Sequence, residues 1–321
     1  MKRGLVIGKF MPIHNGHIAL INFAATHCDE LIVSMSFTPD DKIDPVLRFE
    51  WIKEIFKDQP NIKPAIIADD FDDETLPLSE RTLIWAIRMR EVYPKIDMLF
   101  SSEYYGAPFA HHLQAEDILF DEPRIFIPVS ATLIRNNPFQ YWDFIPTIVR
   151  PYFVKKICFY GPESTGKSTM AEKMALYYET TFVPEVAREL IISNDITVDD
   201  IIKIGTAQTQ RVIEKTKIAN KILFCDTDLI TTKIYSQYYL NEVPNILNDL
   251  ENEIKYDLYF LLDIDVEWVA DHLRDFGNQR SEMFELFKAE LEKRNISYIT
   301  INGNYREREE KIKKIIDSIL V

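Results

Sequence analysis

Cysteine is scarce in this chain of 321 residues: there are three, and no two of them form a Cys-x-x-Cys pair. Cys158 and Cys225 lie inside apolar runs, where a cysteine is typically a small buried side chain. So few and scattered thiols argue against a disulfide framework and are typical of a reducing compartment. We therefore expect a cytoplasmic protein.

A long apolar run and a leader segment are also missing. No stretch of 18 apolar residues occurs, and the N-terminal MKRGLVIGKF begins a strand-like segment almost at once. A membrane-spanning helix needs about 20 apolar residues, and a secretory signal needs an apolar core behind its basic residues. The sequence therefore predicts a soluble protein with no membrane partner.

Basic residues are outnumbered, with 37 Lys and Arg against 51 Asp and Glu, which gives a net charge of −14. Proteins that bind a nucleic-acid backbone usually present a basic face, because phosphate neutralisation dominates their affinity. We therefore expect no nucleic-acid partner. Small phosphorylated ligands remain compatible with this composition, because local charge can oppose the net charge.

The chain has no recurring period and no low-complexity segment, and apolar runs instead alternate with amphipathic stretches. This alternation predicts an α/β protein with parallel sheets and right-handed crossovers. Ser79 is expected to cap the helix over 79–94. The expected strands cover 4–8, 30–37, 62–70, 98–106, 124–132, 156–160, 221–228, 257–265 and 296–303. The expected helices include 16–27, 45–60, 79–94, 167–178 and 203–220.

Prolines and aromatic residues crowd the stretch RNNPFQYWDFIPTIVRPYFVKK at 135–156. Such a stretch indicates short helices that close one domain and lead into the next, because proline interrupts longer helices. We place the boundary near Tyr152 and expect one domain over 1–152 and a second over 153–321.

The segment GKFMPIHNGH, which follows the first expected strand, has the outline of a phosphate-holding turn. Gly8 would allow a ligand to approach the strand end closely, and Lys9 and Phe10 follow it. His14 and His17 are three residues apart at a helix start, so both can face the same side. There the helix N-terminus offers free N–H groups and positive potential. We expect this turn to hold a triphosphate.

A second turn of different design, GPESTGKS, matches the pattern G-x-x-x-x-G-K-[ST] and lies between an apolar strand and a helix. Backbone N–H groups in such a loop surround the phosphates, Lys167 meets the β and γ oxygens, and Ser168 binds Mg²⁺. The expected nucleotide-binding residues here are Gly161, Ser164, Thr165, Gly166, Lys167, Ser168 and Thr169.

A carboxylate is expected near this metal, and Asp226 ends an apolar run where such an acid belongs. Asp228, or Asp226 through water, could accept a proton from a substrate hydroxyl, and the alternative for Asp228 is a cap on the following helix. Glu185 and Arg188 begin another segment and are candidates for contact with substrate. Two further basic residues are candidates for a lid over the γ-phosphate, namely Arg274 and Arg280.

The first turn resembles the GxFxPxHxGH motif of the nicotinamide mononucleotide adenylyltransferases, within the nucleotidylyltransferase superfamily. VSATLIR at 129–135 resembles that family's ISxTxxR. The resemblance implies that Ser130 and Thr132 offer hydroxyl and backbone groups to ATP, and that Arg135 binds its phosphates. It also implies direct attack of the mononucleotide phosphate on ATP, with charge stabilisation in place of a covalent intermediate.

Both halves in this order resemble the NadR family, which joins a nicotinamide mononucleotide adenylyltransferase to a ribosylnicotinamide kinase. The resemblance covers essentially the whole chain, including ESTGKST, FCDTDLITT and EWVADHLRDFG. It implies an N-terminal Rossmann-like nucleotidylyltransferase domain and a C-terminal P-loop kinase domain. It further implies that Asp226, Asp228 and Trp268 surround the riboside, and that the protein forms a homo-oligomer.

The leading hypothesis is therefore a bifunctional enzyme of NAD salvage. Its kinase half would phosphorylate nicotinamide riboside with ATP and Mg²⁺, and its other half would adenylate the mononucleotide to NAD and pyrophosphate. One alternative is a kinase with a weak or inactive adenylyltransferase domain, and another is a nucleotide-sensing regulator. Many relatives carry an N-terminal DNA-binding helix-turn-helix, but here the first turn starts at residue 8, so we expect no repressor role.

Overall fold

The computed structural model describes residues 1–191, 195–269 and 279–320, and the chain divides into two compact units, Met1–Val149 and Arg150–Val321. Among the described residues, each unit contains one five-stranded sheet whose paired strands are all parallel. The predicted α/β fold class is confirmed. Within the same ranges, no helix combines the length and apolar character that crossing a bilayer requires.

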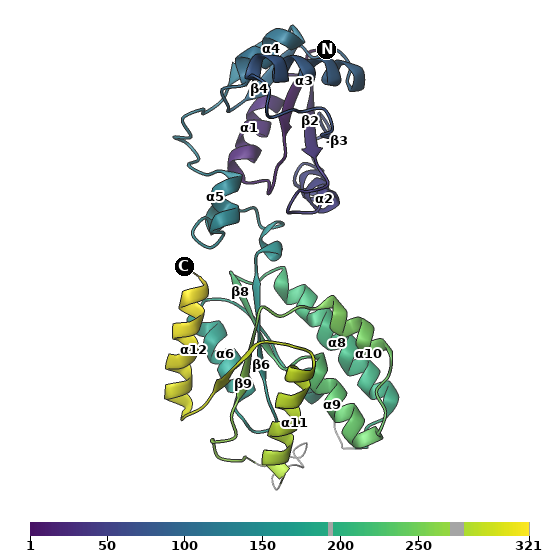
Figure 1. The fold of residues 1–321 in the computed structure, drawn as a ribbon, viewed down its shortest axis with the longest axis vertical. Coiled ribbons are helices and arrows are strands. Elements are labelled where there is room, and N and C mark those ends of the chain that lie inside the picture. Colours follow the sequence, from purple (N-terminus) through teal and green to yellow (C-terminus); the bar gives the residue numbers. More distant parts are fainter. Residues whose placement is uncertain (192–194, 270–278, 321) are drawn as a thin grey trace. The chain divides into compact units, whose positions relative to one another are not determined.

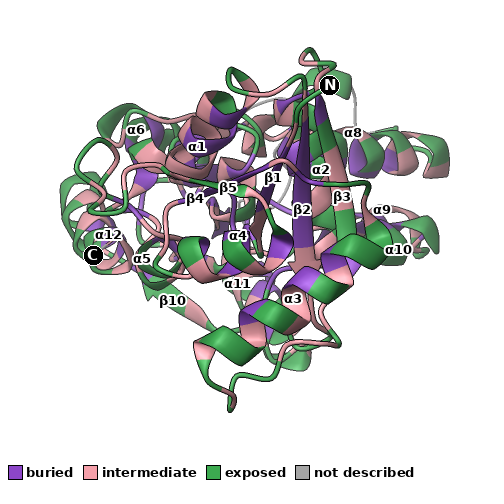
Figure 2. Cartoon of the chain, turned by 90° about the horizontal axis from the view of Figure 1, so that it is seen from above, coloured by how far each residue is buried: buried purple, intermediate pink, exposed green. Residues whose placement is uncertain are grey.

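The first unit has the strand order β3-β2-β1-β4-β5. Leu5, Ile32 and Leu99 of its central strands pack on one face against the apolar sides of two helices, α3 and α4. Figure 2 shows β2 largely in the colour of buried residues, and β1 is buried in its middle. Its elements are β1 (Arg3–Gly8), α1 (Asn15–Ala25), β2 (Glu30–Phe37), α2 (Pro45–Ile55), β3 (Ile62–Ala68), α3 (Leu78–Val92), β4 (Met98–Ser101), α4 (Gly106–Leu113), β5 (Glu116–Leu119), α5 (Ala131–Asn136) and η1 (Trp142–Phe144).

The second unit has the strand order β10-β9-β6-β8-β7, with helices on both faces of the sheet (Figure 1). Alternate residues of its central strand enter different cores, as a pleated strand requires: Phe159 packs with α6 and α12, and Tyr160 with α9 and α11. Its elements are η2 (Arg150–Tyr152), β6 (Lys155–Tyr160), α6 (Lys167–Tyr177), β7 (Phe182–Val183), α7 (Ala187–Leu190), α8 (Val198–Thr216), β8 (Ile222–Asp226), α9 (Leu229–Leu240), α10 (Ile246–Glu253), β9 (Leu258–Leu262), α11 (Arg280–Lys293), β10 (Tyr298–Ile301) and α12 (Tyr305–Ile319).

Two predictions about local structure are wrong. Over 124–130 the expected strand is a loop, because the Asp121 carboxylate accepts hydrogen bonds from the backbone N–H groups of Ile125 and Phe126 and bends the chain, and residues 131–132 already belong to α5. The fifth strand of the sheet is β5 instead. Ser79 does not cap α3, which begins at Leu78 after Pro77, and the N-cap position makes no side-chain hydrogen bond.

In each sheet the chain runs outward from a central strand in both directions, to β2 and β4 around β1 and to β8 and β9 around β6. Ligands of open parallel sheets bind beyond the carboxyl ends of the strands at such a reversal. The two sequence turns begin there, after Gly8 in the first unit and after Tyr160 in the second.

Two candidate nucleotide sites

The first turn is held by two arginines that bind its backbone carbonyl groups. The buried guanidinium of Arg48 on α2 donates to the carbonyl oxygens of Lys9 and Ile43 and pairs with Asp41. Arg135 on α5 donates to the carbonyl oxygen of Met11. Because a peptide group is planar, fixing a carbonyl oxygen also fixes the opposed N–H group. The arginines thereby set the orientation of the peptide groups in the turn.

His14 and His17 form a reciprocal cap at the start of α1. The Nδ1 atom of each ring accepts the backbone N–H of the other residue, at 3.3 and 3.4 Å. The rings stack with their centroids 3.7 Å apart. A nitrogen that accepts a hydrogen bond carries no proton, so a neutral ring must carry its proton on Nε2. The cap therefore selects the Nε2–H tautomer of both histidines.

Both imidazoles are held in the neutral form. Burial, with a smaller effect of the nearby Arg124, lowers the pKa of His14 from 6.5 to about 3. Burial, followed by His14 and Arg124, lowers the pKa of His17 well below its usual range. The pair therefore presents uncharged hydrogen-bond donors.

Two adjoining cavities open at this strand end, and both are lined by Gly8 and Tyr105. The larger measures about 320 Å³ and brings together six of the predicted site residues: Gly8, Phe10, His14, His17, Ser130 and Thr132. Lys9 lines the smaller cavity, of about 210 Å³. Arg135 lines neither, because its guanidinium lies against the Met11 carbonyl and the Thr132 hydroxyl.

The smaller cavity contains functional candidates that the sequence reasoning missed. Asp72 pairs with the guanidinium of Arg81 and also accepts a hydrogen bond from the indole N–H of Trp85, at 2.9 Å. Trp85 and Tyr105 pack edge to face with ring centroids 5.6 Å apart, and both line the cavity. In the sequence Trp85 followed a helical apolar pattern, so nothing distinguished it from a core residue.

The second turn joins β6 to α6 through two glycines with positive φ, Gly161 at 137° and Gly166 at 87°. A Cβ atom on Gly161 would lie 3.0 Å from the carbonyl oxygen of Leu262, so only glycine fits there. The Lys167 ammonium donates to the Pro162 carbonyl oxygen at 2.8 Å. The lysine therefore lies across the mouth of the loop, where an anion would attract it.

Arg308 of α12 fastens this loop from behind. Its guanidinium is fully buried and donates to the carbonyl oxygens of Thr165, Gly303 and Asp263, and it also pairs with Asp265. The loop, the end of β9 and the start of α12 are thus held by one side chain. Arg308 plays the same part here as Arg48 plays in the first unit.

A cavity of about 300 Å³ adjoins the second turn. The loop and Glu185 contribute polar groups to its lining, and α8 and α9 contribute apolar and aromatic side chains, with Ile201, Ile204 and Tyr235 among them. Arg188 lines it too and donates to Glu185 at 2.9 Å. The predicted residues that line this cavity are Ser164, Thr165, Gly166, Lys167, Ser168, Thr169, Glu185 and Arg188.

Asp226 fits a magnesium ligand in both charge and surroundings. Burial and then the nearby Glu185 raise its pKa to about 6, whereas Lys167 and the Ser168 hydroxyl oppose that rise. Its Oδ1 atom is buried and has no hydrogen-bond partner within the described residues. An acidic oxygen beside a hydroxyl and without a protein partner suits a hard cation. No group of three or more His, Cys, Asp or Glu residues is placed to hold a metal in the described ranges.

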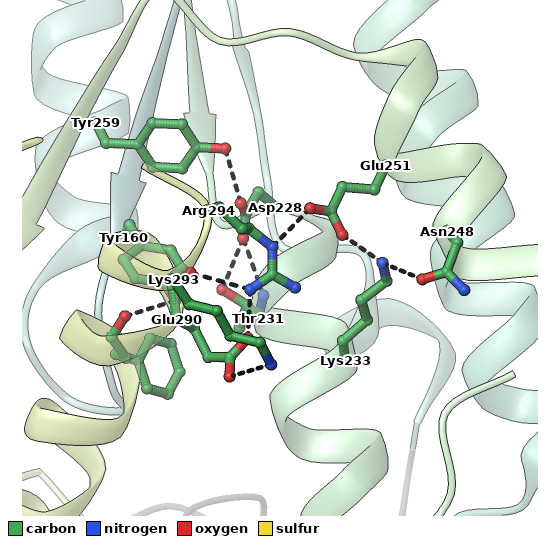
Figure 3. A network of polar contacts seen from close by, with 11 residues as sticks. Tyr160, Asp228, Thr231, Lys233, Asn248, Glu251, Tyr259, Glu290, Lys293 and Arg294 are labelled. Carbon is green, nitrogen blue, oxygen red and sulfur yellow. Dashed lines mark hydrogen bonds and ion pairs between the residues drawn. The ribbon is translucent and has the colours of Figure 1, made fainter. Parts of the chain in front are cut away.

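Asp228 is buried and does not line the cavity, and Figure 3 shows its polar contacts. One carboxylate oxygen accepts from the backbone N–H and the hydroxyl of Thr231, each at 3.0 Å, and the other accepts from the Tyr259 hydroxyl at 2.9 Å. Burial raises the pKa of Asp228 to about 6. These contacts make Asp228 the N-cap of α9, which was the alternative interpretation of the sequence.

Of the two arginines predicted to form a lid, the structure describes Arg280 but not Arg274. Arg280 donates to the carbonyl oxygens of Val266 and Ser164, at 3.0 and 3.4 Å, and its guanidinium lies over the ring of Trp268. It therefore braces the back of the loop, and neither Arg280 nor Trp268 lines the cavity. Arg274 lies outside the described residues.

Comparison with known proteins agrees with this arrangement of two sites. A family described as cytidylyltransferase-like matches residues 5–137, and an AAA domain family matches residues 156–308. The trifunctional NAD biosynthesis/regulator protein NadR of Escherichia coli is 33% identical over 326 residues, which cover 93% of this chain and 78% of that protein. The chain belongs to the NadR family. The Salmonella typhimurium NadR matches to the same extent.

A solved NadR structure in complex with NR has the same fold, with a TM-score of 0.81 over 98% of this chain and 95% of that one, at 22% identity. A nicotinamide-nucleotide adenylyltransferase of Thermococcus kodakarensis is 26% identical over 43% of this chain and 72% of its own length. The predicted family, and with it a nicotinamide-nucleotide adenylyltransferase joined to a ribosylnicotinamide kinase, is confirmed at the level of the family.

Proposed function

We propose that residues 153–321 phosphorylate nicotinamide riboside with ATP, and that residues 1–152 adenylate the resulting mononucleotide to NAD and pyrophosphate. The observation that carries this proposal is the presence, in one NadR-family chain, of two differently built phosphate turns, each beside its own cavity. Two transfers to two acceptors require two ATP sites. The site residues named above take these roles as proposals.

In the adenylyltransferase unit, ATP occupies the larger cavity at the N-terminus of α1. The Nε2–H groups of His14 and His17 donate to its phosphates, Lys9 supplies positive charge from the adjoining smaller cavity, and Arg135 orients the turn through the Met11 carbonyl. A phosphate oxygen of the mononucleotide attacks the α-phosphorus while pyrophosphate leaves. Fixed donors of this kind stabilise the charge that develops in the transition state, so no covalent intermediate is needed.

The smaller cavity of this unit suits the mononucleotide. Its aromatic walls, Trp85 and Tyr105, match a flat ring, and the carboxylates of Asp69 and Asp72 match the positive charge of a pyridinium ring. The two cavities meet at Gly8, where the absence of a side chain lets two phosphate groups approach each other.

In the kinase unit, the loop amides and Lys167 hold the ATP phosphates, and Ser168 and Asp226 hold Mg²⁺. The bound metal supplies charge neutralisation at the transferred group. The proton of the substrate's 5′-hydroxyl passes to a carboxylate that faces the cavity. Glu185 lines the cavity whereas Asp228 is enclosed, so Glu185 is the better placed acceptor. A homo-oligomer in the cytoplasm stays a prediction.

The test supplies the full chain with ATP, Mg²⁺ and either nicotinamide riboside or nicotinamide mononucleotide, and separates the products by chromatography. The proposal expects mononucleotide and NAD from the riboside, and NAD from the mononucleotide. Mononucleotide without any NAD would leave a kinase with an inactive first unit. Binding of both nucleotides without turnover would leave a sensing protein.

A further inference from the structure

Gln208 on α8 carries a polar group that the mechanism above does not use. Its side chain lines the kinase cavity, yet only 1% of the residue is exposed. The Oε1 atom accepts the backbone N–H of Val186 at 3.0 Å. The Nε2 atom has no hydrogen-bond partner among the described residues.

The orientation of this amide is determined by its neighbour. A flip would place the Gln208 NH₂ group against the Val186 N–H, so that two donors would face each other. The acceptor is thus committed to the protein, and the group left over is a donor. A buried donor without an acceptor is unfavourable, which makes such groups rare unless a ligand completes them.

The surroundings of Gln208 indicate which part of a ligand lies there. Ile204 and Ile201 precede it by about one and two turns of α8, and both line the same cavity. Tyr235 and Tyr239 of α9 line it as well. This wall is apolar and suits a flat ring, whereas Lys167 and Glu185 supply charged groups to the same cavity.

We propose that the Gln208 Nε2–H group donates a hydrogen bond to the carboxamide oxygen of the nicotinamide ring and thereby determines specificity for the base. This inference rests on the proposed kinase function. Within an apolar wall, the ring substituent that can satisfy a lone amide donor is a carbonyl oxygen. A ring without that oxygen would fill the same space and leave the donor unpaired.

The experiment compares two substrates in the full chain, nicotinamide riboside and N-ribosylpyridinium, which has the same charged ring but no carboxamide. We expect the parent protein to prefer nicotinamide riboside in kcat/KM by about tenfold or more, the scale of a buried donor that loses its acceptor. Gln208→Met, which keeps the volume but has no donor, should lose this preference. The KM for ATP should not change.

Two further variants make the result interpretable. Gln208→Glu keeps an acceptor for Val186 but has no donor when ionised, so at alkaline pH it should also lose the preference. Thr209→Val is the matched control, because the Thr209 hydroxyl is buried on the same helix without a partner in the described part of the chain, yet does not line the cavity. It should keep the preference.

Equal losses for the two substrates in the Gln208 variants, or an undiminished preference, would overturn the carboxamide contact. Equal losses would mean that the Gln208 donor contacts the ribose, which both substrates share, or that it has a structural role. A parent protein that phosphorylates neither riboside would instead remove the kinase function itself, so the two failures can be told apart.

Discussion

His14 and His17 show how local backbone contacts set the chemistry of a side chain. Their spacing in the sequence predicted a shared face, and the structure confirms it. What the sequence could not supply is their burial and the nearby charge of Arg124, a residue far along the chain that lines the same cavity. Burial keeps both rings uncharged, and the reciprocal cap directs their remaining protons to Nε2.

The lowered pKa values predict how stability depends on pH. The unfolded chain binds a proton at His14 near pH 6.5, whereas the folded chain does so only near pH 3. The stability that comes from keeping His14 neutral is therefore fully present above about pH 6.5 and is lost as the pH falls toward 3. At pH 5, the loss from His14 is about 2 kcal/mol of unfolding free energy. His14→Gln should reduce the loss between pH 7 and pH 5 in urea unfolding.

The comparison with the parent protein reports on His14 together with its effect on the pKa of His17, because the other titrating groups are shared. His27→Gln is the control, since His27 is exposed just beyond the end of the same helix. If His14→Gln leaves the pH dependence of stability as it was, the burial argument for the first site is wrong.

Asp228 allows a second prediction, which separates capping from proton transfer. Asp228→Asn keeps an acceptor for Thr231, so we expect nearly full stability and kinase activity within about tenfold of the parent protein. Asp228→Ala removes the cap and leaves the Tyr259 hydroxyl unpaired, at a cost of about 1–3 kcal/mol of unfolding free energy.

Glu185→Gln should lower the kcat of the kinase reaction by about 100-fold or more. Thermal unfolding and a kinase assay measure both quantities, and an inactive but folded Asp228→Asn would return the base role to Asp228.

Helices placed far away in the sequence hold each phosphate turn. Arg48 of α2 and Arg308 of α12 are both fully buried, and each binds a carbonyl group within a turn. Figure 3 shows another set of contacts between helices, near Asp228. There Glu251 of α10 pairs with Arg294 at the C-terminal end of α11 and with Lys233 of α9. In the sequence, an arginine on an amphipathic helix is indistinguishable from a solvated one.

These contacts predict selective loss of one activity. Arg308→Lys keeps the charge but cannot reach four acceptors at once, so carbonyl groups behind the loop remain unpaired, at about 1–3 kcal/mol each. We expect the KM for ATP in the kinase reaction to rise by about tenfold or more, with the adenylyltransferase reaction unchanged. Arg48→Lys should have the opposite selectivity.

Arg306→Lys serves as the control for this pair, because Arg306 is exposed on α12 and its guanidinium pairs with Glu310 one turn along the same helix. Its kinetics should match those of the parent protein. If Arg308→Lys leaves the KM for ATP unchanged in a folded protein, the arginine does not position the loop.

The elements that could be predicted are those whose signal is local. Both strand–turn–helix motifs were predictable, because their glycines, histidines and lysine lie within a few residues of one another. The loop over 124–130 was not, since its apolar residues resemble a strand in the sequence, whereas Ile125 and Phe126 are 76% and 80% exposed in the structure. Trp85 and Gln208 escaped notice because their significance depends on Asp72 and Val186, which are distant in the sequence.

At the scale of the whole molecule, the chain consists of two complete α/β units, each with its own sheet, reversal of strand order and cavity. The predicted boundary near Tyr152 lies close to the division between Val149 and Arg150. Because each unit contains all the elements that form its cavity, a substitution in one site should not lower the activity of the other.

Product analysis of His17→Ala and Lys167→Ala tests this independence most directly. From nicotinamide riboside and ATP, His17→Ala should accumulate mononucleotide and form no NAD. Lys167→Ala should form NAD from supplied mononucleotide but nothing from the riboside, and a mixture of the two proteins should again convert riboside to NAD. If either variant, shown to be folded, loses both activities, the assignment of two separate ATP sites is contradicted.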